Sequence, residues 1–284
     1  MKIISGLREL AANYDVLVCD IWGVIHNGVE AYPGVVDTLR RFRENGTVLL
    51  LSNAPRPNGP IREQLASLSV TEDAYDTLVT SGDLTRRVLA ERAPLKIHRV
   101  GPDRDGPLFE NLDVQLVAMK DADAIVCTGP FDDTTEGPDD YRDYWREALA
   151  RRLPFYCANP DLVVQRGDQM IYCAGALAED YERQGGEVLY LGKPYAPAYD
   201  FVAERLRELN RRDIPKAKWL AVGDGLKTDI AGATQAGIDS LLITGGIHES
   251  ELAHADGTPD PAKIGSLFAE RKLKSVAAMR RLLW

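Results

Sequence analysis

Short apolar runs that stop at a polar residue recur along the chain. The first covers residues 16–19, Val-Leu-Val-Cys, and ends abruptly at Asp20. A run this short with no polar face is typical of a strand buried on both faces of a parallel sheet. We expect further strands of this kind over residues 47–51, 78–80, 188–191, 219–222 and 240–244, the last being the final strand of the chain.

Segments with helical periodicity separate these runs. In residues 33–45, the side chains of Val35, Val36, Leu39 and Phe42 fall on one face. We also expect helices over residues 61–68, 198–210 and 228–236, and a helix-rich tail from Pro261 onward. Alternating strands and helices predict right-handed βαβ units, and therefore an α/β fold with a parallel sheet.

The middle of the chain has its own set of elements. We expect strands over residues 97–100, 124–127 and 155–158, and helices over 141–150 and 174–184. Residues 132–140 are acidic and rich in turn formers, which predicts an exposed loop. The simplest organisation is an α/β core domain formed by residues 1–82 and 187–284, with a second α/β domain, residues 83–186, inserted in it.

Composition narrows the class of protein. The chain has 284 residues, 45% apolar and 27% charged, which excludes a disordered or fibrous chain. Its 43 acidic and 34 basic residues give a net charge of −9, which argues against a nucleic-acid partner. The sequence contains no signal-peptide pattern and no apolar run near the ~20 residues of a membrane span. Its 4 cysteines form no CxxC pair, so we expect buried free thiols in a cytoplasmic protein.

Polar side chains follow several of the predicted strands. Asp20, Ser52-Asn53, Lys193 and Asp224 each stand at a carboxyl end, the edge at which open parallel sheets bind ligands. Asp20 suits a nucleophile or a metal ligand, and Lys193 suits a phosphoryl group. Asp224 and Asp229, across a glycine-bearing loop, suit Mg²⁺ with its oxygen ligands. Each residue alone also fits a turn, a cap or a solvated surface, and only the ordered set indicates a site.

This ordered set resembles the haloacid dehalogenase (HAD) superfamily of hydrolases over nearly the whole chain. The four motifs are residues 19–24, 51–54, 192–194 and 223–229. The inserted segment, with Ala-Asn-Pro-Asp at 158–161 and Gly-Ala-Leu at 175–177, resembles the class IIA cap of nitrophenylphosphatase- and phosphoglycolate phosphatase-like members. The resemblance implies a Rossmann-like three-layer α/β/α core with an inserted α/β cap domain.

The resemblance also implies an activity. It is that of a Mg²⁺-dependent phosphohydrolase acting on a small phosphorylated metabolite, through an aspartyl-phosphate formed on Asp20. The implied metal site comprises the carboxylates of Asp20 and Asp224 and the Trp22 carbonyl, supported by Asp229. Residues implied to bind the phosphoryl group or the rest of the substrate are Trp22, Gly23, Ser52, Asn53, Asn159 and Lys193. Class IIA relatives are often dimers through the cap, so a homodimer is a candidate partner.

The first motif departs from the family pattern at Trp22. Most phosphatases of the family carry a second Asp there, which protonates the leaving oxygen, and an indole N–H cannot do this. Three interpretations are open: His26 substitutes for the Asp, the leaving group needs no acid, or the protein binds a phosphoryl ligand in a regulatory role with weak hydrolysis. Some halide-releasing relatives also carry an aromatic residue here, but the metal motif ending at Asp229 argues against that chemistry because it needs no Mg²⁺.

Overall fold

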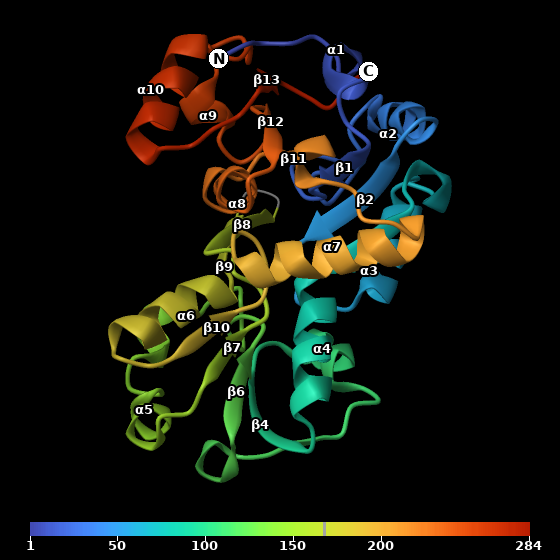
Figure 1. Ribbon diagram of the computed structural model, residues 1–284. Coiled ribbons are helices and arrows are strands. Elements are labelled where there is room, and N and C mark those ends of the chain that lie inside the picture. Colours follow the sequence, from blue (N-terminus) through green and yellow to red (C-terminus); the bar gives the residue numbers. More distant parts are fainter. Residues whose placement is uncertain (167–168) are drawn as a thin grey trace. The chain divides into compact units, whose positions relative to one another are not determined.

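Two compact units make up the chain in the computed structural model, which describes residues 1–166 and 169–284. Each unit contains its own parallel β-sheet with helices along it (Figure 1), which confirms the predicted α/β class. The first unit comprises Met1–Ser52, Ile61–Val79 and Tyr199–Trp284, and the second comprises Asn53–Pro60 and Thr80–Ala198.

The larger sheet has six strands, in the order β13-β12-β11-β1-β2-β3. The neighbouring strands from β13 to β2 pair in parallel. All four side chains of β1 are buried, as the apolar run predicts for a strand covered on both faces. The strands are β1 Val16–Cys19, β2 Thr47–Ser52, β3 Thr77–Thr80, β11 Trp219–Gly223, β12 Asp239–Ile243 and β13 Ala277–Met279.

Helices connect these strands and bury the apolar faces that the sequence predicts. In α2, the side chains of Val35, Leu39 and Phe42 are buried, whereas Val36, also expected on this face, is only partly buried. None of the helices in the described chain has the length and apolar character of a membrane span. The helices are α1 Arg8–Ala11, α2 Val35–Arg43, α3 Asn58–Ser67, α7 Ala196–Asn210, α8 Ala231–Ala236, α9 Glu249–Leu252 and α10 Pro261–Arg271, with short turns at Glu72–Ala74, Lys216–Lys218 and Leu226–Ile230.

The second unit is built on a five-stranded sheet in the order β10-β7-β6-β4-β5, with all its pairs parallel. An antiparallel hairpin, β8–β9, lies outside this sheet. The strands are β4 Leu95–Val100, β5 Val114–Leu116, β6 Ala124–Cys127, β7 Phe155–Cys157, β8 Val163–Arg166, β9 Gln169–Tyr172 and β10 Val188–Tyr190. The helices are α4 Ser81–Arg92, α5 Arg146–Arg151 and α6 Ala174–Arg183, with 3₁₀ turns at Asp103–Phe109, Met119–Asp121 and Pro138–Tyr141.

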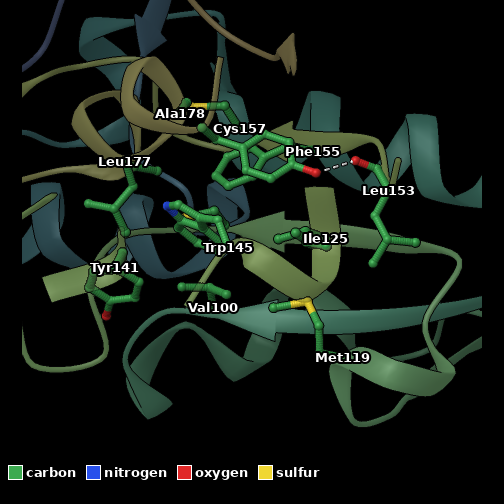
Figure 2. Close-up of a cluster of buried hydrophobic side chains, with 14 of the residues drawn as sticks. Val100, Met119, Ile125, Tyr141, Trp145, Leu153, Phe155, Cys157, Leu177 and Ala178 are labelled. Atoms are coloured by element: carbon green, nitrogen blue, oxygen red, sulfur yellow. Dashed lines mark hydrogen bonds between the residues drawn. The ribbon is translucent and has the colours of Figure 1, made fainter. Parts of the chain in front are cut away.

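Aromatic side chains fill the core of the second unit (Figure 2). Trp145 is fully buried, and its ring centroid lies 5.6 Å from those of Phe155 and Tyr181, edge to face with both. The Tyr181 hydroxyl donates to the Leu153 carbonyl at 2.7 Å, so the buried phenol has a partner. All four cysteines are free and buried, as predicted from their apolar surroundings.

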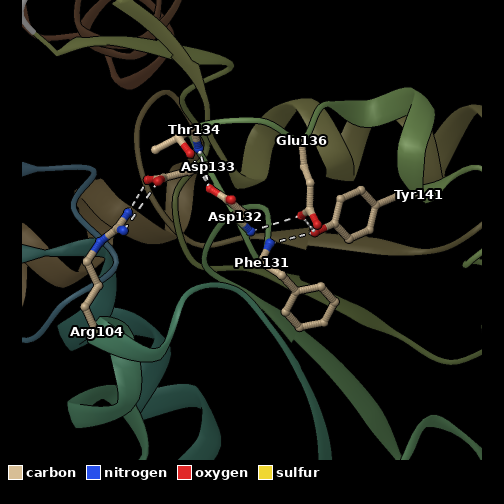
Figure 3. Close-up of polar contacts among 7 residues, drawn as sticks. All are labelled: Arg104, Phe131, Asp132, Asp133, Thr134, Glu136 and Tyr141. Atoms are coloured by element: carbon tan, nitrogen blue, oxygen red, sulfur yellow. Dashed lines mark hydrogen bonds and ion pairs between the residues drawn. The ribbon is translucent and has the colours of Figure 1, made fainter.

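The acidic segment after β6 forms hydrogen-bonded turns (Figure 3). The Tyr141 hydroxyl donates to Glu136 Oε2 at 2.6 Å and accepts the backbone N–H of Phe131. Asp133 forms an ion pair with Arg104. Most of the segment is exposed, which confirms the predicted loop up to the 3₁₀ turn that begins at Pro138.

The expected set of elements differs from the structure in several places. The helix expected over 141–150 covers only Arg146–Arg151, because Pro138 opens a 3₁₀ turn ahead of it. The strand over 240–244 is not the last, since β13 follows at an edge of the larger sheet. The sequence Ala-Ala-Met of β13 is too short and too rich in helix formers to read as a strand. The hairpin β8–β9 is also absent from the prediction, because its two strands mix polar and apolar residues irregularly.

Candidate active site

The larger sheet brings Asp20 and Asp224 to neighbouring strand ends. Asp20 follows β1 and Asp224 follows β11, and these two strands pair with Cys19 opposite Val222. The backbone N–H of Asp20 donates to the Val222 carbonyl at 2.8 Å, which extends the ladder by one residue. Ser52 ends β2 on the other side of β1. These three polar residues therefore share the carboxyl edge of one sheet, where parallel sheets bind ligands.

Asp229 joins the two strand-end carboxylates in a cluster. Asp20, Asp224 and Asp229 each offer one oxygen, and these oxygens lie within 4.8 Å of one another. Asp224 and Asp229 are each only 5% exposed. Like charges held this close, away from water, repel one another unless a cation neutralises them. Because every donor is a hard oxygen, the set fits a divalent cation such as Mg²⁺.

Two glycines leave room for the Asp224 carboxylate. A Cβ atom at Gly246 would lie 1.9 Å from Asp224 Oδ2, and one at Gly23 would lie 2.1 Å from the same oxygen. The backbone N–H of Ile247 donates to this oxygen at 2.8 Å and fixes its position. Gly23 thus has a packing role beside Asp224, in addition to the substrate contact that the sequence predicts. Gly246 was absent from the predicted site, although a Gly-Gly pair directly after a strand is a signal for close backbone approach.

Asp229 is set by the turn that follows β11. It lies in the π-helical turn Leu226–Ile230, and its Oδ2 accepts the backbone N–H of Gly225 at 3.0 Å. A Cβ atom at Gly223 would lie 2.2 Å from Asp229 Cβ, so only glycine allows this approach. The Gly-x-Gly spacing of the loop therefore places a second carboxylate beside the first.

A separate polar group in the second unit surrounds Lys193. Asn53 Oδ1 accepts the backbone N–H of Lys193 at 2.8 Å, and Asn53 Nδ2 donates to the Lys193 carbonyl at 3.0 Å. The same Nδ2 donates to Asp161 Oδ1 at 2.9 Å, and the Ser81 hydroxyl donates to Oδ1 at 3.4 Å. The Asn53 amide is thus occupied by protein partners, and its observed role is to position Lys193. Lys193 itself is 3% exposed.

Asn159 contributes to the position of Lys193 indirectly, through Asp161 and Asn53. Its Oδ1 accepts the backbone N–H of Asp161 at 3.1 Å across Pro160, which is an Asx turn. Asp161 in turn holds Asn53, so the turn sequence Asn-Pro-Asp supports the residue that positions Lys193. The family resemblance implies a substrate contact for Asn159, and no local sequence pattern indicates this chain of hydrogen bonds.

Trp22 and His26 lie together in the loop after Asp20. Their ring centroids are 5.3 Å apart at an interplanar angle of 87°. His26 is buried, and its Nδ1 accepts the backbone N–H of Gly28 at 2.9 Å. Burial lowers the pKa of His26 to about 4, so the ring is neutral at pH 7. A Cβ atom at Gly28 would lie 2.2 Å from Trp22 Cη2, so the indole rests directly on this glycine.

Comparison with known proteins places this arrangement among hydrolases. A family model described as haloacid dehalogenase-like hydrolase matches residues 17–115, and one described as HAD-hydrolase-like matches residues 190–267. These two segments contain all three clustered carboxylates and Lys193. The family models thus fall on both parts of the chain that carry the predicted motifs.

Individual relatives agree with the family models. A hydrolase of the haloacid dehalogenase-like family from Brucella suis is 39% identical, with a TM-score of 0.86, over 99% of this chain and 100% of that one. Ribonucleotide monophosphatase NagD of Escherichia coli is 28% identical over 86% of this chain and 92% of its own. D-glycerol 3-phosphate phosphatase of Mycobacterium tuberculosis is 27% identical over 95% of this chain and 76% of its own.

Proposed function

The chain belongs to the haloacid dehalogenase-like hydrolases, as a class IIA phosphatase, and from this premise we propose that it hydrolyses small phosphorylated metabolites with Asp20 as nucleophile and Mg²⁺ as cofactor. Phosphatases of this family depend on a metal. The observation that carries the proposal is the cluster of Asp20, Asp224 and Asp229, whose oxygens lie within 4.8 Å of one another. A nucleophile and a cation site at one sheet edge are what phosphoryl transfer requires.

The proposed metal ligands are the Asp20 and Asp224 carboxylates and the Trp22 carbonyl, with Asp229 supporting the site. When bound, Mg²⁺ supplies positive charge for the phosphoryl oxygens and for the three carboxylates. Asp224 is held by the Ile247 N–H, and Asp229 by the Gly225 N–H. These contacts fix two carboxylates before any ligand arrives, which reduces the reorganisation needed for catalysis.

Asp20 is proposed to attack phosphorus directly. One of its carboxylate oxygens forms a bond to phosphorus while the bond from phosphorus to the leaving oxygen breaks. The product is a mixed anhydride on Asp20, which water then hydrolyses to release phosphate. Lys193 is proposed to bind the phosphoryl group through its ammonium, and Asn53 to hold the backbone on either side of that lysine.

The remaining roles follow the domain organisation expected from the sequence. We propose a catalytic core of residues 1–82 and 187–284 and a substrate-recognising cap of residues 83–186, with Ser52, Gly23 and Asn159 near the substrate. A homodimer through the cap and a cytoplasmic location are proposed with it. Four buried free thiols support a reducing compartment.

The decisive experiment is the loss of one carboxylate. Purified protein is screened against phosphorylated metabolites with Mg²⁺, with and without a chelator. Asp20→Asn is expected to abolish hydrolysis of every accepted substrate, because an amide is not a nucleophile for phosphorus. Asp37→Asn, at an exposed ion pair with Arg41, is the control and should leave the rate unchanged. Hydrolysis that survives Asp20→Asn would refute the proposal.

A second candidate function is phosphoryl-ligand binding with only slow turnover, and Trp22 is the observation that favours it. Tight binding of a phosphorylated metabolite together with very slow release of phosphate from all compounds would support this role. Rapid hydrolysis of any one class of phosphoryl compound would exclude it.

A further inference from the structure

The loop after the proposed nucleophile contains one imidazole and no carboxyl, hydroxyl or thiol side chain. Residues 21–27 read Ile-Trp-Gly-Val-Ile-His-Asn. The loop folds back on itself, because the Ile25 N–H donates to the Ile21 carbonyl at 2.8 Å and the Gly23 N–H donates to the His26 carbonyl at 2.9 Å. His26 is therefore the only residue of this loop that could protonate a leaving oxygen.

Hydrogen bonding removes His26 from that role. Its Nδ1 accepts the backbone N–H of Gly28 at 2.9 Å, so the remaining ring proton is on Nε2. His26 as a whole is only 2% exposed. Accepting a further proton at Nδ1 would break the bond to Gly28 inside the protein. His26 is thus a structural residue that holds the loop.

Trp22 is fixed in place by the same loop. Its indole packs edge to face on His26, at 5.3 Å between ring centroids, and against the α-carbon of Gly28. Gly28, whose φ is 89°, permits this approach because it lacks a Cβ atom, which would lie 2.2 Å from Trp22 Cη2. An indole N–H is a donor only and does not release its proton. The position two residues after Asp20 is therefore filled by a group that cannot serve as an acid.

We propose that Trp22 restricts this phosphatase to activated phosphoryl compounds, above all acyl phosphates, whose leaving group departs as a stable anion. The inference rests on Asp20 acting as the proposed nucleophile. As Asp20 oxygen bonds to phosphorus, the electron pair of the breaking bond stays on the leaving oxygen. A carboxylate holds that pair without a proton, whereas the alkoxide from an alkyl phosphate needs one in the transition state. General acid help is worth about 10²–10⁴-fold in rate, so alkyl phosphates should be slower by that order.

The experiment compares leaving groups of graded basicity. Wild-type protein with Mg²⁺ is assayed by single turnover on acetyl phosphate, on a series of substituted aryl phosphates and on glycerol 3-phosphate. We expect the rate constant to fall steeply as the leaving group becomes more basic, and glycerol 3-phosphate to react at least about 100-fold more slowly than acetyl phosphate. Rates within tenfold of each other for those two compounds would overturn the inference.

Two variants separate acid chemistry from packing. Trp22→Asp adds a carboxylic acid, and it should flatten the dependence on leaving group and add an acid limb to the pH–rate profile. Trp22→Phe keeps an aromatic ring without an acid, and it should keep the steep dependence. A steep dependence in folded Trp22→Asp would count against the inference. If circular dichroism shows that Trp22→Asp does not fold, the wild-type comparison still decides.

The same assays distinguish failure of the proposed function from failure of this inference. If no compound is hydrolysed, or if Asp20→Asn retains activity, the nucleophile is wrong and the inference falls with it. If alkyl and acyl phosphates react alike, and both reactions depend on Asp20, the proposed function stands and only the restriction by Trp22 is refuted.

Discussion

Asp105 is a buried carboxyl whose surroundings disfavour its charge. It is 3% exposed, and burial raises its pKa above the usual 3.8, opposed by the Thr128 hydroxyl and by Arg104 and Arg56. Ionising Asp105 at pH 7 therefore costs free energy in the folded protein, whereas in the unfolded chain water solvates the carboxylate fully. We expect Asp105→Asn to raise the free energy of unfolding at pH 7. The gain should shrink as pH falls and approach zero below about 3.8, where the carboxyl is protonated in both states. Urea unfolding measured from pH 7 to 3 tests this.

Asp132, in the same unit, is a control whose replacement by Asn should change stability in the opposite direction. It is exposed, and its pKa is lowered by hydrogen bonds from the Thr134 hydroxyl and backbone N–H (Figure 3). Its ionised form therefore contributes stability that is present above the unfolded pKa and is lost as pH falls through the folded one. Asp132→Asn should lower stability at pH 7. If Asp105→Asn also lowers it, burial is not the dominant influence on Asp105.

Gly246 tests how tightly the proposed metal site is built. In Gly246→Ala the new Cβ atom would lie 1.9 Å from Asp224 Oδ2, so the carboxylate must move although no ligand is replaced. Loss of a group that orients a ligand typically weakens metal binding about 10–100-fold, and we expect this for Mg²⁺. Isothermal titration gives the affinity directly. Gly265→Ala is the control: its Cβ meets open space in α10, so affinity should not change and stability should rise by about 0.5–1 kcal/mol.

At the scale of residues, the sequence predicts which side chains lie at the same sheet edge. It does not predict which side chains are joined by hydrogen bonds. Asp20 and Asp224 could be paired because each ends an apolar strand. The hydrogen-bond partners of Asn53 could not be predicted in this way, since Asp161 is 108 residues away and Lys193 is 140 residues away. No local pattern encodes which distant backbone an amide will hold.

The N-terminus of α4 contains a capping box that should stabilise the whole helix. The Thr80 hydroxyl accepts the Asp83 N–H at 2.9 Å, and Asp83 Oδ2 accepts the Thr80 N–H at 3.0 Å. Asp83 Oδ1 also accepts the backbone and side-chain N–H groups of Asn58. We expect Asp83→Ala to cost about 1–2 kcal/mol, because several donors lose their acceptor together. Urea unfolding followed by far-UV circular dichroism measures the change.

The matched control lies at the other end of the same helix. Glu91 forms an exposed ion pair with Arg87 at 2.8 Å, one turn apart. Such pairs contribute about 0.3–0.5 kcal/mol, so Glu91→Ala should change stability only slightly. Equal losses from Asp83→Ala and Glu91→Ala would mean that the capping box adds nothing beyond a surface charge.

At the scale of elements, the prediction succeeds where one type of side chain dominates a segment. The runs at β1, β6 and β11 are apolar throughout, so burial on both faces decides their structure. The pattern fails for β13 and for the hairpin β8–β9, whose strands are held by pairing with a neighbouring strand and not by a local apolar pattern. Helix ends also shift by a few residues, since α3 begins at Asn58 and not near Ile61.

At the scale of the molecule, the sequence predicts that the middle of the chain forms a unit of its own. The compact second unit also contains Asn53–Pro60 and extends to Ala198. The added segments include Asn53 and Lys193, which are joined by hydrogen bonds between residues distant in sequence. Whether the functional core and cap divide at residues 82 and 187 stays a prediction.

The division into units predicts where Mg²⁺ should protect the protein. All three clustered carboxylates belong to the first unit. A ligand that binds only the folded state stabilises by RT ln(1 + [L]/Kd), about 2.7 kcal/mol at 100 times Kd. We therefore expect amide exchange, followed by mass spectrometry, to slow up to about 100-fold in β1 and β11, and to change little in β4, β6 and β7. Asp224→Asn is the control and should abolish the protection. Equal slowing in both units would show that they open together, and no slowing in either unit would refute the metal site.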